Sequence, residues 1–236
     1  MSHCRQKTGK TKLTPATAIC PNEPAKILIT MTELFSTPSL SRKGNNTRIA
    51  LIRSGVAAMT THGYISANIE SILKQVGVPK GSFYHYFKSK QEFGIAILEY
   101  YDYFFTEKLE QHLLNQNISS ALARISAFCT DAKTSMAKYH FNRGCLVGEL
   151  MQNESLLPQN YPALLNNILH NWQEKIACCL QLAQQQQEIS SQTDCTKLAY
   201  FFWLGWEGAV SRAKLLKNAT PLDIFTEQFF NLIKNH

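Results

Sequence analysis

A chain of 236 residues, 44% of them hydrophobic, is long enough to bury a core and to form one or two domains. Its net charge of +7 is uneven, because the first 94 residues hold thirteen Lys and Arg against four acids and the remaining 142 hold eleven against thirteen. The seven cysteines are odd in number, which argues against a disulfide framework, and they form no C-x-x-C pair, which argues against a structural zinc site. We therefore expect reduced thiols in a cytoplasm.

Residues 1–46 are rich in Thr, Pro, Ser, Lys and Asn without a sustained hydrophobic period, so we expect a disordered basic tail. Met31 is an alternative start, which would leave residues 1–30 untranslated; peptides from that stretch in the native protein would exclude this hypothesis. No apolar run of sufficient length follows the basic N-terminal stretch, so we expect no signal peptide. The most apolar segment, residues 198–210, is too short to span a bilayer and contains Glu207, which predicts a soluble protein with no membrane partner.

A first helix is predicted from about Arg48 to His62, with one apolar face, and Gly63 is expected to end it. Asn68 is suited to cap a second helix of about two turns, because its side chain can accept a hydrogen bond from the first backbone N–H groups. Gly77 supplies the left-handed turn at the end of that helix, and Pro79 opens the next one. The pattern is that of a helix-turn-helix within a DNA-binding domain of residues 47–94.

The helix that starts at Pro79 is predicted to have two faces. Phe83 and Phe87 are four residues apart and should anchor the helix to its neighbour. The ridge of Lys80, Tyr84 and Lys88 is then free to face a groove of DNA. The positive charge of the first 94 residues fits this interpretation, although for residues 1–46 alone a solvated tail is preferred.

A long connecting helix is expected from Lys90 to about Asn115, and it would link the head to a second, helical domain of residues 95–236. Its inner side is predicted to carry Phe93, Ile97, Tyr101, Phe104 and Leu109. Further helices are expected at about residues 119–138, 144–154, 161–187, 193–217 and 220–234, with Pro158, Pro162 and Pro221 at boundaries. The predicted fold class is all-α, with about nine helices and no competing strand pattern.

The last two long helices are predicted to form a dimer contact. Phe201 and Leu204 belong to a segment more aromatic than one buried face requires, and Gly205 and Gly208 would let another helix approach closely. The alternative is an intramolecular core. A two-fold protein would imply a palindromic operator in double-stranded DNA.

A specific string of residues resembles the TetR family of bacterial transcriptional regulators. It comprises Gly63-Tyr64, Gly77-Val78, Lys80-Gly81-Ser82-Phe83-Tyr84, Tyr86-Phe87 and Lys88-Ser89-Lys90. The departures are Pro79, where the family often has serine, and Leu73, where it often has alanine. The resemblance implies homodimers paired through the last two helices, with repression as the usual mode.

The resemblance and the chemistry of the side chains together assign roles in DNA binding. Lys80 and Tyr84 can reach base edges or phosphates, and Gly81 and Ser82 are small enough for close approach. Tyr86 and Lys90 match family positions that usually hold phosphates, and His85 can serve either role. Tyr86 is equally well explained as a core aromatic, and Asn68 as a helix cap that does not also read DNA.

A second candidate site is the segment from Arg143 to Glu149. Gly144 is predicted to break the chain before a helix, which places Cys145 in the first turn, where the helix N-terminus would lower the thiol pKa. Basic side chains just upstream could also help to lower the thiol pKa, namely Lys138, His140 and Arg143. From chemistry alone, a buried and inert cysteine is favoured.

The family resemblance favours a reactive Cys145 over a buried and inert one. The recognition string, Phe93-Gly94 and Gly144-Cys145-Leu146 together resemble the branch that includes the repressor of N-ethylmaleimide reductase, which senses electrophiles and oxidants through a cysteine at this motif. The same string also resembles acrylate-responsive regulators. The resemblance implies that Cys145 is the sensing residue.

Three hypotheses follow from the sequence. The main one is a homodimeric repressor that is released from its operator by a small reactive electrophile or oxidant at Cys145. The second is a repressor induced by reversible binding of a small apolar ligand in the aromatic-rich body, with Cys145 structural. The third is an enzyme with Cys145 as nucleophile and His140 as base. The sequence argues against it, because it shows neither an orienting acid nor a cofactor-binding glycine pattern. No cofactor and no metal are expected.

Overall fold

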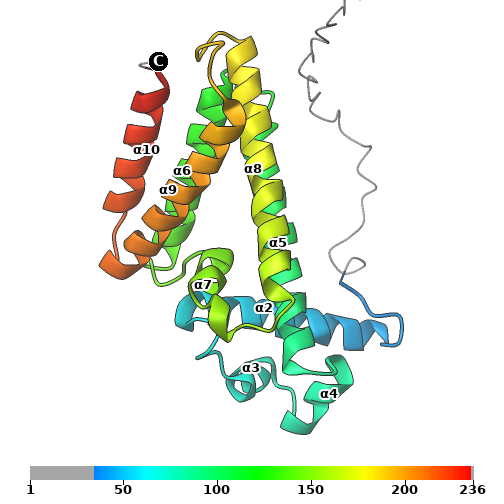
Figure 1. Cartoon of the computed structure of the whole chain (residues 1–236). Helices are drawn as coiled ribbons and strands as arrows, with labels where there is room; N and C mark the ends of the chain where they lie inside the picture. The colour runs from blue at the N-terminus through cyan, green and yellow to red at the C-terminus, as the bar shows by residue number, and fades with distance from the viewer. Residues whose placement is uncertain (1–34, 235–236) are drawn as a thin grey trace, which may run out of the picture.

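The computed structural model describes residues 35–234, and in that range it contains nine α-helices and no strand. The all-α prediction is therefore confirmed (Figure 1). The α-helices are α2 (Arg42–His62), α3 (Ile69–Val76), α4 (Phe83–Tyr86), α5 (Lys90–Leu113), α6 (Ala121–Lys138), α7 (Leu146–Gln152), α8 (Tyr161–Gln185), α9 (Cys195–Leu216) and α10 (Thr220–Lys234). Two 3-10 turns, η1 (Lys80–Ser82) and η2 (Glu154–Leu156), complete the order. None of the helices between residues 35 and 234 is long and apolar enough to cross a membrane.

The first helix begins earlier than the sequence predicts. Ser41 caps α2 by accepting a hydrogen bond from the Gly44 backbone N–H, so the helix starts at Arg42 and not near Arg48. Buried Asn45 accepts from the Thr37 backbone N–H at 2.7 Å and so fixes the preceding turn. The predicted tail of residues 1–46 therefore extends too far, because residues 42–46 belong to α2. Residues 1–34 lie outside the described residues.

The head consists of α2, α3, η1 and α4 and lies at one end of the long helix α5 (Figure 1). Its core includes Phe83 and Phe87, whose ring centroids are 5.7 Å apart, and Phe93 of α5, which lies 4.6 Å from the Phe87 ring. These three side chains are at most 5% exposed. The predicted anchoring role of the two head phenylalanines is thus confirmed, and α5 belongs to both the head and the body.

The body packs α5, α6, α8, α9 and α10 around a second aromatic core. Trp172 of α8 lies 4.3 Å from Phe105 and 5.3 Å from Trp203, measured between ring centroids. Its indole N–H donates to Asp102 at 2.8 Å. The body aromatics thus pack mainly against one another, whereas Phe104, which was predicted to face inward on α5, is 56% exposed and that prediction is wrong.

Gly205 illustrates how closely α9 and α10 pack within one chain. A Cβ atom added at Gly205 would lie 2.3 Å from Cε2 of Phe225, so only glycine leaves room for the α10 ring. The prediction that Gly205 faces a second copy is corrected accordingly. A Cβ at Gly208 would meet nothing within 4 Å, which leaves that position open on the outer face of α9.

Gly205→Ala is expected to lower the free energy of unfolding by roughly 1–3 kcal/mol, because the new methyl group overpacks the α9–α10 contact. Gly81→Ala is the control outside the proposed dimer interface, because a Cβ atom there would meet nothing within 4 Å. It should be neutral or stabilising by up to about 1 kcal/mol, since alanine restricts the unfolded chain more than glycine does. Urea unfolding of both variants at one protein concentration measures the difference. Equal stability of the two variants would contradict the packing argument.

Candidate DNA-binding surface and cysteine site

The turn of the helix-turn-helix forms as its residues predict. Asn68 caps α3, since its Oδ1 accepts a hydrogen bond from the Glu70 backbone N–H at 2.8 Å. Gly77 ends α3 in the left-handed conformation, with φ of 76°, and its N–H bonds to the Leu73 and Lys74 carbonyls. The capping role of Asn68 is therefore confirmed, and its side chain is engaged in that bond.

The following helix is shorter than expected. A single 3-10 turn begins after Pro79, α4 follows for four residues, and Phe87 is extended with φ of −142°. Lys88 therefore lies beyond the helix, and the predicted single ridge that includes it is corrected. Its backbone N–H donates to Glu92 Oε2 at 2.9 Å, in the loop that Ser89 ends by capping α5.

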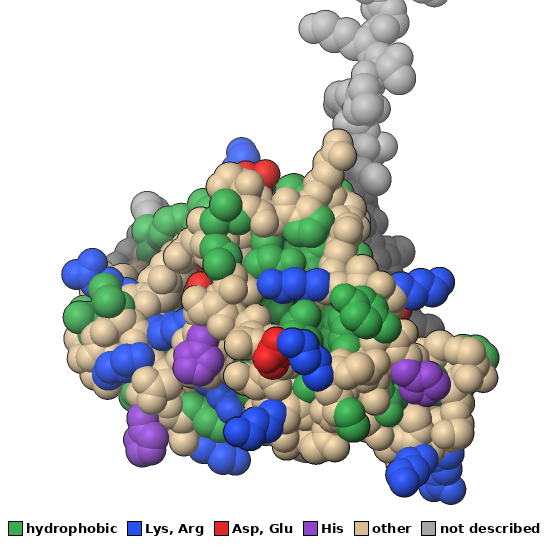
Figure 2. Space-filling view, turned by 90° about the horizontal axis from the view of Figure 1, so that it is seen from below, with side chains coloured by type: hydrophobic (Ala, Val, Ile, Leu, Met, Phe, Trp, Pro, Cys, Tyr) green, Lys and Arg blue, Asp and Glu red, His purple; other side chains and the backbone are tan. Residues whose placement is uncertain are grey.

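The predicted DNA contacts lie together on the outer face of the head. Tyr84 is 74% exposed, and the Lys80 ammonium forms a solvent-exposed ion pair with Glu70 at 2.6 Å. Figure 2, which views the molecule from the head end, shows Lys, Arg and His side chains distributed over this face. Exposed positions are Asn68, Lys80, Gly81, Tyr84, His85, Lys88 and Lys90, and half-buried positions are Ser82 and Tyr86.

Tyr86 and Lys90 occupy the border between this surface and the core. Tyr86 packs against the head core and its ring lies 5.1 Å from that of His85. The Lys90 ammonium lies 5.8 Å from the centre of the Tyr64 ring, a cation–π arrangement. Tyr86 is therefore half-buried at the edge of the head core, whereas Lys90 is exposed.

Cys145 is half-buried and stands at the N-cap position of α7. Burial and then the carboxylate of Glu207 raise its pKa well above the ordinary value of a thiol, against the opposing effects of the Gly148 backbone N–H and the Tyr101 hydroxyl. The predicted lowering of its pKa is therefore wrong in this conformation. Arg143, which was expected to contribute, instead stacks on the Tyr139 ring at 3.9 Å.

The loop that carries Cys145 touches the head directly. His140 and Phe141 have φ of 52° and 53°, an unfavourable conformation for side chains of their size. Gly144 then donates from its backbone N–H to the Thr60 carbonyl of α2 at 3.2 Å. The cysteine is thus one residue away from a hydrogen bond to the first helix of the head.

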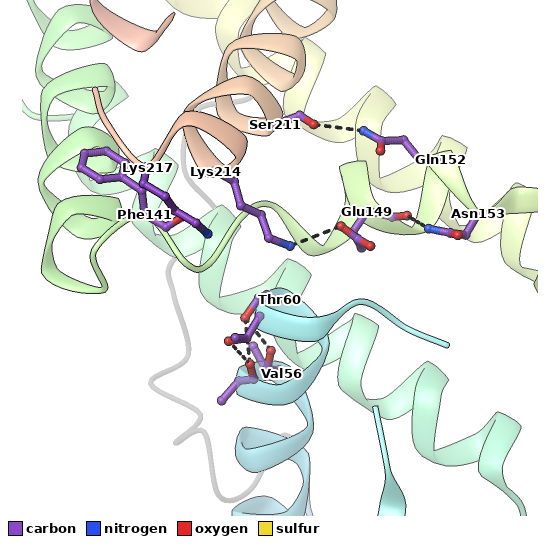
Figure 3. A network of polar contacts seen from close by, with 11 residues as sticks. Val56, Thr60, Phe141, Glu149, Gln152, Asn153, Ser211, Lys214 and Lys217 are labelled. Atoms are coloured by element: carbon purple, nitrogen blue, oxygen red, sulfur yellow. Dashed lines mark hydrogen bonds and ion pairs between the residues drawn. The ribbon is translucent and has the colours of Figure 1, made fainter. Parts of the chain in front are cut away.

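A polar network extends this contact from the loop to α7 and α9 (Figure 3). Glu149 of α7 pairs with Lys214 of α9 at 3.4 Å, and a Cβ atom at Gly63 would lie 2.6 Å from the Glu149 carboxylate. Lys217 donates to the Phe141 carbonyl at 3.5 Å. Elements far apart in the sequence therefore meet at the C-terminal end of α2.

The other described cysteines differ from Cys145. Burial raises the pKa of Cys129 to about 12, and the Cys179 thiol donates to the Ala121 carbonyl at 3.4 Å. In the described part of the chain, no group of His, Cys, Asp or Glu side chains has the arrangement of a metal site. The sequence alone does not identify Glu207 as a neighbour of Cys145, although Glu207 is the single acid in the apolar segment of residues 198–210.

An open groove of about 480 Å³ lies away from Cys145, between α2, α5 and α8. Its polar lining includes Arg48, Glu99 and Asp102, and its apolar lining includes Leu164 and Ile168. Burial raises the pKa of Glu99 and opposes the effect of Arg48 on it. The groove therefore offers mixed polar and apolar contacts to a small molecule.

Two family descriptions match this chain. Residues 51–97 match bacterial regulatory proteins of the tetR family, and residues 121–229 match a Tetracyclin repressor-like C-terminal domain. The first match spans most of the head and the start of α5, and the second spans most of the helical body.

Three individual proteins are similar over most of the chain. The transcriptional regulator AcuR of Cereibacter sphaeroides is 44% identical over 180 residues, which are 76% of this chain and 82% of that protein. The HTH-type transcriptional repressor NemR of Escherichia coli is 28% identical over 202 residues, 80% of this chain and 94% of NemR. The crystal structure of a regulatory protein TetR from Rhodobacter sphaeroides is 43% identical, with a TM-score of 0.76 over 78% of this chain and 97% of that one.

Proposed function

Because this chain belongs to the TetR family of transcriptional regulators, we propose that it is a homodimeric repressor, released from a palindromic operator by a small reactive electrophile or oxidant at Cys145. The observation that carries the proposal is the position of Cys145, one residue after the Gly144 contact with Thr60 of the head. The relatives are regulators and not enzymes, so the alternative of a cysteine enzyme with His140 as base is set aside.

The exposed residues of η1 and α4 are proposed to dock in the major groove. Lys80 and Tyr84 contact base edges or phosphates, while Gly81 and Ser82 permit close approach of the backbone. His85, Tyr86, Lys88 and Lys90 add phosphate contacts around them, and Asn68 supports the surface as a cap. This arrangement is supported by the exposure of the side chains and by the match of residues 51–97 to the family.

The dimer is proposed to form on the outer face of α9 and α10. Phe201 and Leu204 are 47% and 62% exposed, and Gly208 lies one turn further on the same face with open space above it. Exposed leucine and isoleucine side chains continue this apolar surface at Leu215, Leu216, Ile224 and Leu232. An apolar surface of this extent on a helix pair is typical of an interface, and a two-fold dimer would present two heads to successive major grooves.

Release is proposed to pass from the loop to the head. An adduct or oxidised sulfur on Cys145 would not fit the half-buried site, and relaxation of residues 139–145 would alter the contact with α2. The effector therefore favours the conformation with weaker DNA affinity, which is the thermodynamic requirement for induction. A regulator of this type acts in the cytoplasm.

A second candidate function is induction by a reversible ligand, with Cys145 structural. It is favoured by the raised pKa of Cys145 and by the groove of about 480 Å³ between α2, α5 and α8. In that case the ligand would bind to groups such as Asp102 and Ile168, and the thiol would contribute only packing.

An electrophoretic mobility shift on the DNA upstream of the gene tests the proposed function. Wild-type protein should shift the DNA and release it after treatment with N-ethylmaleimide or hypochlorite, whereas Cys145→Ser should bind equally well and stay bound. Cys195→Ser serves as the matched control and should leave release intact, since Cys195 lies at the start of α9, whereas the loop meets the other end of that helix at Lys214. If Cys145→Ser is released like wild type, sensing at Cys145 is refuted and the reversible ligand is favoured.

A further inference from the structure

A carboxyl group from α9 lies directly beside the Cys145 side chain. A Cβ atom added at Gly148 would be 2.2 Å from Oε2 of Glu207 and 3.7 Å from Cβ of Cys145, so both side chains lie over the same glycine. Glycine at this position is what allows the carboxyl group to reach the thiol. The other carboxyl oxygen, Oε1, is buried and has no hydrogen-bond partner among the described residues.

The protein surroundings of Glu207 bring the pKa of its carboxyl group close to neutral pH. Burial raises the pKa of the carboxyl group to about 7, and its contact with Cys145 opposes the shift only in part. The titratable groups that face it are the Cys145 thiol before α7 and the Tyr101 phenol of α5, whose own pKa burial raises well above normal. In the described residues, no charged side chain of α6, α8 or α10 contributes to its shift.

We propose that Glu207 accepts the proton of Cys145 when the thiol adds to a small, uncharged α,β-unsaturated carbonyl compound. This inference rests on the proposed sensing role of Cys145 and specifies the residue that makes a resting thiol reactive. A thiol whose ionisation is disfavoured needs a base within reach to attack at neutral pH, and the Glu207 carboxylate is the base that is hydrogen-bonded to it.

The reaction is an addition that needs no oxidant or other co-reactant. As the S–C bond forms at the β-carbon, the S–H proton passes to the Glu207 carboxylate and the π electrons of the C=C bond move towards the carbonyl group. The α-carbon then takes the proton back from the Glu207 carboxyl group. The product is a saturated thioether on Cys145, and the carboxylate is regenerated. An uncharged compound enters this site more easily than an anion, which the carboxylate repels.

Glu207→Gln distinguishes a proton acceptor from a charge that merely repels the thiolate. If Glu207 is the base, the glutamine variant should react with acrylamide about tenfold more slowly at pH 7.5, or slower still, because a positioned base accelerates proton transfer by orders of magnitude. If the carboxylate only raises the thiol pKa by repulsion, its removal should make Cys145 react faster. The two roles therefore predict changes of opposite sign.

The measurement is the rate of acrylamide labelling at each cysteine of the full chain between pH 5.5 and 9, followed by mass spectrometry of digested protein without DNA. The wild-type rate at Cys145 should rise through about pH 7 and then level off, following the carboxyl group. Glu207→Gln should lack that inflection, and Glu207→Asp should retain it. Cys195, which is buried, serves as the reporter of unfolding, and Glu149→Gln is the control for an acid of α7 that faces Lys214.

The outcomes separate this inference from the proposed function. Equal or faster labelling of Cys145 in Glu207→Gln, with the wild-type pH profile, would overturn the role of Glu207 while leaving Cys145 as the sensor. No adduct on wild-type Cys145 at any pH would overturn both. Slow labelling of Glu207→Gln together with unchanged labelling of Cys195 and an unchanged thermal unfolding curve supports the proton acceptor, because a folding defect would expose every cysteine.

Discussion

Replacing Lys80 and Tyr84 together by alanine is expected to weaken operator binding roughly a hundredfold or more. Each side chain is exposed on the turn and helix that are proposed to enter the major groove, at 77% for Lys80 and 74% for Tyr84. A base-edge contact contributes about 1–3 kcal/mol, and each loss is counted twice in a dimer on a palindromic site. The ion pair of Lys80 with Glu70 is exposed and contributes little to folding, so the fold should be retained.

Fluorescence anisotropy of labelled operator DNA at several salt concentrations would measure this loss. Removal of Lys80 alone should reduce the dependence of log Kd on log salt by about one per head if the ammonium contacts a phosphate. Tyr84→Phe separates the hydroxyl group from the ring. Lys197→Ala is the control for charge, because that side chain is 87% exposed at the start of α9, outside the head. Wild-type affinity of the double variant would refute the docking arrangement.

Local signals in the sequence predicted the helix-turn-helix well. Asn68 and Gly77 determine the ends of α3 by chemistry that acts within a few residues, namely a side-chain cap and a left-handed glycine. The start of α2 was missed because Ser41 and Asn45 stabilise it within a segment whose composition resembles a solvated tail. Lys88 was misplaced because α4 ends after a single turn, which periodicity over so few residues cannot indicate.

The cysteine site was predictable in position but not in chemistry. Gly144 does precede a helix, but Cys145 stands at the N-cap and not in the first turn that the local pattern predicts. The pKa of the thiol depends on burial and on Glu207, which is 62 positions further along the chain and meets it only through the packing of α9 against α7. The effect of the helix N-terminus involves only neighbours in sequence, and here burial and the Glu207 carboxylate outweigh it.

Gly205 and Gly208 look equivalent in sequence, and only the tertiary structure distinguishes them. Gly205 accommodates the Phe225 ring of the same chain, whereas Gly208 faces open space. Only the arrangement of α9 against α10 separates an intramolecular contact from the outer face on which the dimer is proposed. The proposed interface is therefore tested at the exposed residues Phe201 and Leu204 and not at Gly205.

Leu204→Asp is expected to convert the proposed dimer into a monomer and to abolish tight operator binding. Leu204 is 62% exposed in the single chain, so an aspartate there does not disturb the core, but in a two-fold interface it would bury two like charges without partners. Sedimentation should then give a mass near 26.7 kDa, where the wild type should give about twice that value. Operator affinity should fall by roughly a hundredfold or more, because the second head no longer binds as part of one molecule.

Leu156→Asp is the matched control, since Leu156 is also 62% exposed but belongs to η2 and not to α9 or α10. It adds the same charge and removes the same apolar area, so it should remain dimeric and bind the operator as wild type does. A monomeric Leu204→Asp that still binds half-site DNA weakly would place the defect in pairing and not in the head. A dimeric Leu204→Asp would instead locate the interface elsewhere, because two buried aspartates on a shared apolar surface are incompatible with stable pairing.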